Sequence, residues 1–148
     1  MQIVANNKKA FFEYFILEKI EAGIQLTGDE VKSLRSGKAS IKEAYAEAKK
    51  GQLYLVNSDI SNYDKASSYS KLDSKRVRKL LVHKKQISKL QGKIEKEGMT
   101  IVPLKLYFNN KGIAKIEIAI AKGKKLYDKR EVKKKKDWNV QKKRLLKN

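Results

Sequence analysis

The most constraining stretch of this 148-residue chain lies at residues 100–121, where two runs of alternating apolar residues flank a short turn. The turn sequence Asn-Asn-Lys-Gly at 109–112 is typical of a β-hairpin, so both runs predict antiparallel strands. Pro103 lacks a backbone N–H and should therefore lie at a sheet edge or a bulge. One side of each strand is expected to carry Val102, Leu104, Leu106 and Phe108, and Ile116, Ile118 and Ile120, respectively.

Shorter β patterns precede this hairpin. Residues 11–24 alternate loosely and are rich in aromatic and branched side chains, which predicts a strand with a kink near Gly23. Residues 44–49 and 52–58 predict two strands joined by a tight turn. Residues 76–83 begin with alternating basic residues and end in an apolar run, which is also typical of a strand.

Two segments carry helical patterns. Thr27 and Glu30 have the spacing of a capping box, which predicts a short helix at about residues 28–36. Residues 84–97 repeat apolar side chains at helical spacing, and Gly92 is a place where that helix could divide in two. The repeated apolar residues are Ile87, Leu90 and Ile94.

Five to six short antiparallel strands with two to three short helices are most economically closed as a small barrel. We therefore predict a mainly β fold, an oligonucleotide-binding (OB) type barrel formed by residues 1–121. A basic C-terminal tail, residues 122–148, follows it. The polar, serine-rich segment 61–74 is expected to be a mobile loop.

Positive charge is concentrated in the tail. Residues 122–148 hold 13 Lys and Arg against three acidic residues, a net charge of +10 and half of the chain's +20. Because apolar residues are few there, the tail should be disordered when free. The barrel carries the other half of the charge. A basic body with a denser cationic tail predicts a polyanionic partner, RNA or DNA.

Several function classes find no support in the residues. The chain has no cysteine, no apolar run near the roughly 18 residues of a membrane span, and no signal-peptide pattern, so a cytoplasmic location is expected. A single histidine, His83, argues against a transition-metal site, and no motif orients it as a general base. The pair Asp29-Glu30 is fully explained by the capping box. We therefore expect no enzyme activity, cofactor or metal.

The residues alone leave three functions open. An RNA-binding adaptor fits the charge and the barrel, whereas a constitutive ribosomal or assembly protein fits the tail equally well. A nuclease or RNA-modifying enzyme would need an acid–base or metal constellation that the sequence does not display. Glu21 and Glu30 either serve solubility and capping or accept hydrogen bonds from base amino groups or ribose hydroxyls.

Six motifs occur in order along essentially the whole chain: Asn7-Lys-Lys-Ala10, Glu21-Ala-Gly-Ile24, Leu26-Thr-Gly-Asp-Glu-Val-Lys-Ser-Leu-Arg35, Arg78-Lys-Leu-Leu-Val-His83, Val102-Pro-Leu-Lys-Leu-Tyr107 and Gly123-Lys-Lys-Leu-Tyr-Asp-Lys-Arg130. Together they resemble the SmpB family of SsrA-binding proteins. The resemblance implies a monomeric, non-enzymatic partner of transfer-messenger RNA (tmRNA), which rescues stalled bacterial ribosomes by trans-translation. It also implies that the barrel binds the tRNA-like domain of tmRNA. The tail would enter the vacant decoding site and message channel and become helical on ribosomal RNA.

The resemblance assigns candidate site residues to both parts of the chain. RNA-binding positions fall on Asn7, Glu21, Leu81 and Lys115, and the basic strand at 76–83 adds Arg76, Arg78, Lys79 and His83. The positions expected on the ribosome are Gly123, Lys124, Lys125, Asp128, Lys129, Arg130, Trp138, Leu145 and Leu146. The segment Leu-Asp-Ser-Lys at 72–75 departs from the Pro-containing turn common in the family, which bears on loop geometry.

Overall fold

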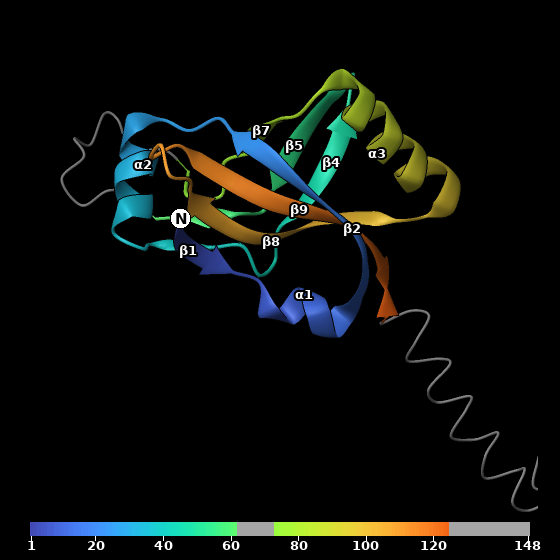
Figure 1. Cartoon of the computed structure of the whole chain (residues 1–148), viewed down its shortest axis with the longest axis horizontal. Helices are drawn as coiled ribbons and strands as arrows, with labels where there is room; N and C mark the ends of the chain where they lie inside the picture. The colour runs from blue at the N-terminus through green and yellow to red at the C-terminus, as the bar shows by residue number, and fades with distance from the viewer. Residues whose placement is uncertain (62–72, 125–148) are drawn as a thin grey trace, which may run out of the picture.

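The computed structural model describes residues 1–61 and 73–124 (Figure 1). Within these ranges the chain forms nine strands and three helices. The strands are β1 (Gln2–Asn6), β2 (Tyr14–Ile24), β3 (Ala39–Ser40), β4 (Tyr45–Lys49), β5 (Gln52–Val56), β6 (Asp59–Ile60), β7 (Arg78–Leu81), β8 (Thr100–Phe108) and β9 (Ala114–Gly123). The helices are α1 (Lys8–Glu13), α2 (Gly28–Arg35) and α3 (Lys84–Glu97).

Six antiparallel strands close into a ring. Their order is β8-β4-β5-β7-β2-β9, and β9 pairs with β8 to complete the circle. Strand β8 closes the ring because it is long: its start pairs with β4 at Ile101, while residues 105–108 pair with the added strand β1. The prediction of a mainly β, OB-type barrel with short helices is therefore confirmed.

The barrel core is filled by side chains that point inward from every strand of the ring. Figure 1 shows α2 and α3 at opposite ends of the barrel, and each sends apolar side chains into the core. Closure removes most exposed strand edges, which otherwise invite aggregation. Core residues with almost no exposed surface include Leu34, Leu53, Leu55, Leu80, Leu90, Ile101, Ile116, Ile118 and Ile120.

Pro103 lies at an irregularity of β8, as predicted. The pairing register between β8 and β9 shifts immediately after Pro103. Because a bulge inverts the alternation of side chains, Leu106 and Phe108 pack in the barrel core, whereas Val102 and Leu104 join a second, smaller cluster. The expectation that all four share one side is wrong for this reason.

Helix α1 replaces the start of the strand expected at residues 11–24. Asn7 caps this helix by accepting a hydrogen bond from the backbone N–H of Ala10 at 3.2 Å, and β2 begins only at Tyr14. Six residues are too few for a helical period to be visible in a sequence. The irregularity of β2 also differs from the expected kink near Gly23, because the register with β9 shifts between Ile16 and Glu18.

The two predicted helices and the two predicted hairpins are present. The capping box of α2 is complete, and α3 spans residues 84–97. Helix α3 runs unbroken through Gly92, so the suggested division is wrong. One glycine costs a helix only about 1 kcal/mol, and the buried Ile87 and Leu90 hold α3 against the core. The β4–β5 turn has positive φ at Lys50 and Gly51, as a two-residue hairpin requires.

Two further outcomes concern the chain's organisation. Strand β9 continues to Gly123, two residues past the expected end of the barrel at 121. Most of the loop predicted at 61–74 lies outside the described residues. Of the helices in the described ranges, none combines the length and apolar character that crossing a membrane would require.

Candidate nucleic-acid interface

The outward side of β7, β2, β9 and β8 gathers residues that are far apart in the sequence. Cross-strand pairing places Leu81 opposite Gly23 on β2. Gly23 is in turn opposite Lys115 of β9, and Lys115 is opposite Tyr107 of β8. Since paired residues lie about 5 Å apart on one face, these four form a continuous row across four strands.

A second row lies two positions along the strands, on the same side. Glu21 pairs with Glu117, and Glu117 pairs with Lys105. We call the two rows together the four-strand face. It comprises Glu21, Gly23, Leu81, Lys105, Tyr107, Lys115 and Glu117, and three of these, Glu21, Leu81 and Lys115, are predicted RNA-binding residues brought together by the fold.

Gly23 sets the shape of this face. A Cβ atom at this position would lie 3.2 Å from the Leu81 Cβ, closer than side chains normally approach. Any larger residue would therefore displace Leu81, whose side chain is half exposed. Because residue 23 is a glycine, the Leu81 side chain has room on this face beside the charged residues.

Four members of the face were not predicted as site residues: Gly23, Lys105, Glu117 and Tyr107. Of these, Tyr107 makes the most specific contact. It is only 5% exposed, and its hydroxyl donates a hydrogen bond to the Glu21 carboxylate. Burial, followed by the Glu21 hydrogen bond and charge, raises the pKa of Tyr107 well above its usual range. The Lys105 ammonium lies 5.9 Å from the ring centre. In the sequence Tyr107 lies between Leu106 and Phe108, which are core residues, and this alternation already indicated that the Tyr107 side chain is on the outward side.

Arg78 has a structural role in place of the predicted RNA contact. Its guanidinium is fully buried and donates to Glu30 Oε2 at 2.6 and 2.9 Å and to Ser58 Oγ at 2.9 Å. The expectation is corrected because no part of this side chain reaches solvent. The sequence did carry a signal, since Arg78 shares the inward parity of the core residue Leu80 on β7.

Glu30 joins this buried network from α2. Arg76 Nη2 donates to its Oε1 at 2.6 Å, and the Thr27 backbone N–H donates to the same oxygen at 2.9 Å. Burial alone would raise the pKa of Glu30, but the hydrogen bonds from Arg76, Thr27 and Arg78 outweigh it and lower that pKa. The capping box is thus confirmed but does not explain Glu30 fully, because the carboxylate also anchors two arginines from β7 and the segment before it.

Asn7 is also corrected from RNA contact to structural support. The side chain is 3% exposed, and its Nδ2 donates to the backbone carbonyls of Pro103 at 2.9 Å and Ile41 at 3.3 Å. It occupies the gap on β8 between the segments paired with β4 and β1. An asparagine can do this because its amide donates and accepts at once.

The other predicted barrel residues remain partly accessible. Arg76 keeps a third of its side chain exposed beside Glu30. Lys79 is half-buried and shares the outward parity of Leu81 on β7. His83 is exposed at the start of α3, where its backbone N–H donates a hydrogen bond to Gln86 Oε1 at 3.4 Å. For these residues RNA contact stays a prediction.

A second exposed surface surrounds the point where β9 ends. Phe11, Phe12, Phe15 and Leu17, from α1 and the start of β2, are between 40% and 80% exposed, and we call them the aromatic patch. The Lys124 ammonium lies 4.8 Å from the Phe15 ring centre, and that of Lys19 lies 5.8 Å from the Phe11 ring centre. Exposed rings beside cations suit the stacking of unpaired bases.

Of the predicted tail residues, Gly123 and Lys124 belong to the described part of the chain. Gly123 ends β9 opposite Tyr14. The remaining seven lie outside the described residues: Lys125, Asp128, Lys129, Arg130, Trp138, Leu145 and Leu146.

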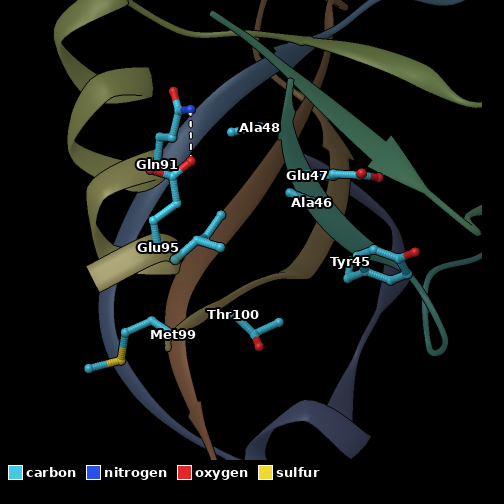
Figure 2. A pocket seen from close by; sticks show the side chains of 9 residues that line it. Tyr45, Ala46, Glu47, Ala48, Gln91, Glu95, Met99 and Thr100 are labelled. Carbon is cyan, nitrogen blue, oxygen red and sulfur yellow. Dashed lines mark hydrogen bonds between the residues drawn. The ribbon is translucent and has the colours of Figure 1, made fainter. Parts of the chain in front are cut away.

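A groove of about 420 Å³ separates α3 from β4 (Figure 2). Figure 2 shows Ala46 and Ala48 of β4 on the side toward α3, whereas the Glu47 side chain points away from α3. On α3, Gln91 donates to Glu95 at 3.1 Å. The described residues that line the groove include two glutamates and no lysine or arginine, so its charge disfavours phosphate. The four-strand face is therefore a better candidate RNA interface than this groove.

A closed six-stranded barrel with a mixed polar sheet face, an aromatic patch and a basic extension defines an OB-type RNA-binding protein. The family model described as SmpB protein matches residues 4–148. The chain belongs to the SmpB family.

Individual relatives agree with this assignment. The SsrA-binding protein of Nitrobacter winogradskyi is 56% identical over 146 residues, covering 99% of this chain and 92% of that protein. The SsrA-binding protein of Rhodopseudomonas palustris strain BisB5 is 55% identical with the same coverage. A solved structure described as "tmRNA-SmpB: a journey to the center of the bacterial ribosome" contains a chain 49% identical to this one. The two superpose with a TM-score of 0.67 over 80% of this chain and 82% of that chain.

Proposed function

We propose that this protein is the RNA-binding adaptor of trans-translation, which binds the tRNA-like domain of tmRNA and delivers it to stalled ribosomes. The observation that carries the proposal is the four-strand face, where Glu21, Leu81 and Lys115 meet in a chain of the SmpB family. The adaptor performs no chemistry of its own and acts by binding two RNAs.

The chemistry of the four-strand face suits a folded RNA whose unpaired bases are accessible. Lys105 and Lys115 offer positive charge to phosphates, which positions the RNA but carries little sequence information. Glu21 offers a fixed acceptor to a base amino group or a ribose 2′-hydroxyl. Leu81 offers an exposed apolar contact for a base or sugar. Arg76, Lys79 and His83 extend the charged surface along the segment that includes β7.

The second RNA in this proposal is ribosomal. In this proposal residues 122–148, with 13 basic residues, occupy the vacant decoding site and message channel. Trp138 and Leu145, seven residues apart in the sequence, would add apolar contacts to that charge. The aromatic patch and Lys124 lie where β9 ends and would extend this ribosomal surface onto the barrel.

A protein with these partners works in the cytoplasm, as a monomer on one tmRNA. Neither proposed step requires a cofactor or a metal, because both consist of recognition by charge, hydrogen bonding and stacking.

Truncation after Lys124 tests the division of labour. This end point preserves β9 in full, so the barrel should fold and bind the isolated tRNA-like domain within about twofold of the full chain. Peptide tagging on stalled ribosomes should be lost. A folded barrel that no longer binds the tRNA-like domain would contradict the proposal. Equal occupancy of all ribosomes, stalled or translating, would instead favour a constitutive ribosomal protein.

A further inference from the structure

Tyr107 presents a feature that barrel packing does not explain. The residue is 5% exposed, yet its hydroxyl donates to the carboxylate of Glu21, a residue on the exposed surface of the face. Burial keeps water from this hydroxyl, so it needs a protein acceptor, and the Glu21 carboxylate is that acceptor. The same bond holds one oxygen of an otherwise exposed glutamate in a fixed place.

The strand register shows how this contact is reached. Tyr107 lies in the row of Lys115 and Gly23, whereas Glu21 lies in the neighbouring row. The tyrosine thus extends diagonally across β9 to reach β2. In its own row β2 offers Gly23, which has no side chain that could accept the hydroxyl proton. In these two rows Glu21 is therefore the residue of β2 that offers Tyr107 a carboxylate acceptor.

Without Tyr107 the Glu21 carboxylate would have little reason to keep one position. Its paired neighbour on β9 is Glu117, and like charges opposite each other in a sheet repel. An exposed glutamate also has several free rotamers, which it must give up when it binds a ligand. The raised pKa of Tyr107 keeps its hydroxyl protonated, and hence a donor, throughout the physiological range.

We propose that Tyr107 is a positioning residue for RNA recognition: it holds Glu21 through Oε2 and directs Oε1 toward a base amino group or a ribose hydroxyl. The inference rests on the proposed function, because it assumes that the four-strand face binds tmRNA. It assigns to Tyr107 no direct RNA contact. The tyrosine acts by fixing the acceptor before the RNA arrives, which lowers the entropic cost of binding.

A double-mutant cycle tests this role with the full chain and an RNA of the tRNA-like domain. Glu21→Ala should weaken binding by about 10- to 100-fold, as expected for loss of a charged hydrogen-bond acceptor. Tyr107→Phe retains the ring and removes only the hydroxyl, and it should weaken binding by about 3- to 10-fold. The double variant should bind no more weakly than Glu21→Ala alone, because Tyr107 acts only through Glu21.

Two further measurements separate positioning from a general structural effect. The slope of log affinity against log salt should be the same for Tyr107→Phe and the unmodified chain, since no phosphate contact is lost. Tyr45→Phe, which removes an exposed hydroxyl beside the α3–β4 groove, is the matched control and should bind normally. Thermal unfolding of each variant confirms that binding is measured on folded protein.

Each outcome decides a different question. Unchanged binding by Glu21→Ala would overturn the proposed RNA face itself. Weakened binding by Glu21→Ala with unchanged binding by Tyr107→Phe would overturn the positioning role alone. Additive losses in the double variant, or a reduced salt slope for Tyr107→Phe, would also overturn it, because either result means that Tyr107 acts independently of Glu21.

Discussion

At the scale of single residues, two basic residues at neighbouring positions of one strand serve opposite purposes. Arg78 and Lys79 are adjacent in β7, yet Arg78 is fully buried against Glu30 whereas Lys79 points outward. A buried guanidinium is tolerated because it is paired and fully hydrogen-bonded. Arg78 and Glu30 therefore connect α2 to the barrel wall. On this strand, a charge that RNA could reach comes from Lys79, whose side chain alternates to the outward side.

The buried pair yields a prediction on stability. Arg78→Ala should lower the free energy of unfolding by about 3–5 kcal/mol, because it removes a fully buried guanidinium and its hydrogen bonds to Glu30 and Ser58. Arg76→Ala, at a partly exposed position, should cost clearly less. Urea denaturation of both variants measures the difference, and equal losses would contradict the role assigned to Arg78.

Glu30 also predicts how stability depends on pH. Its pKa in the folded state is lowered from the ordinary value of 4.5. The unfolded chain therefore binds a proton first as pH falls, so this carboxylate stabilises the fold above about pH 4.5 and loses that effect as pH falls toward the lower folded pKa. Glu30→Gln should show a flatter loss of stability in this acid range. Unfolding free energies measured from pH 7 to pH 3 compare the two, and parallel curves would count against the assignment.

At the scale of elements, the length of a segment decides whether its pattern can be recognised. Helix α3 has 14 residues with three apolar positions at helical spacing, so its bounds follow from the sequence. Helix α1 has six residues, and its aromatic side chains are of a type that is common in strands, so the sequence predicts a strand there. Asn7 fixes α1 through the cap and through two carbonyls of distant segments, which no local pattern encodes.

Replacing Asn7 should therefore destabilise the contact between α1 and the barrel. Asn7→Ala should cost about 1–3 kcal/mol of unfolding free energy, from the lost cap and two buried carbonyls left without their donor. RNA affinity of the folded fraction should be unchanged, since the side chain is buried. Asn6→Ala, an exposed position of β1, provides the control. A loss of RNA affinity at full stability would restore Asn7 as an RNA contact.

At the scale of the whole molecule, the two surfaces proposed to bind RNA are built from different parts of the chain. The four-strand face is made by strand pairing, whereas the aromatic patch lies on α1 and β2 where β9 ends. At that end the Lys124 ammonium lies 4.8 Å from the Phe15 ring centre, so a cation and an exposed ring lie together. This separation would let one adaptor hold tmRNA and the ribosome at the same time.

The separation predicts different effects for changes on the two surfaces. Phe12, at 80% exposed, contributes little to packing, so Phe12→Ala should change stability by less than about 0.5 kcal/mol. It should leave binding to the tRNA-like domain intact and reduce tagging on stalled ribosomes. Weaker binding to the isolated tRNA-like domain would mean that the two surfaces are not separate.

The amino-acid sequence by itself determined the β class, the hairpin at 100–121, the capped helix α2, the helix α3 and the unequal distribution of charge. These features depend on residues within a few positions of one another, and local patterns record them directly. The tertiary structure alone decided that Leu81, Gly23, Lys115 and Tyr107 form one row and that Arg78 meets Glu30 and Ser58. Such neighbours depend on strand register and on the bulge after Pro103, where a shift of one residue exchanges inside and outside. Closure of the barrel sets that register, and a linear pattern does not contain it.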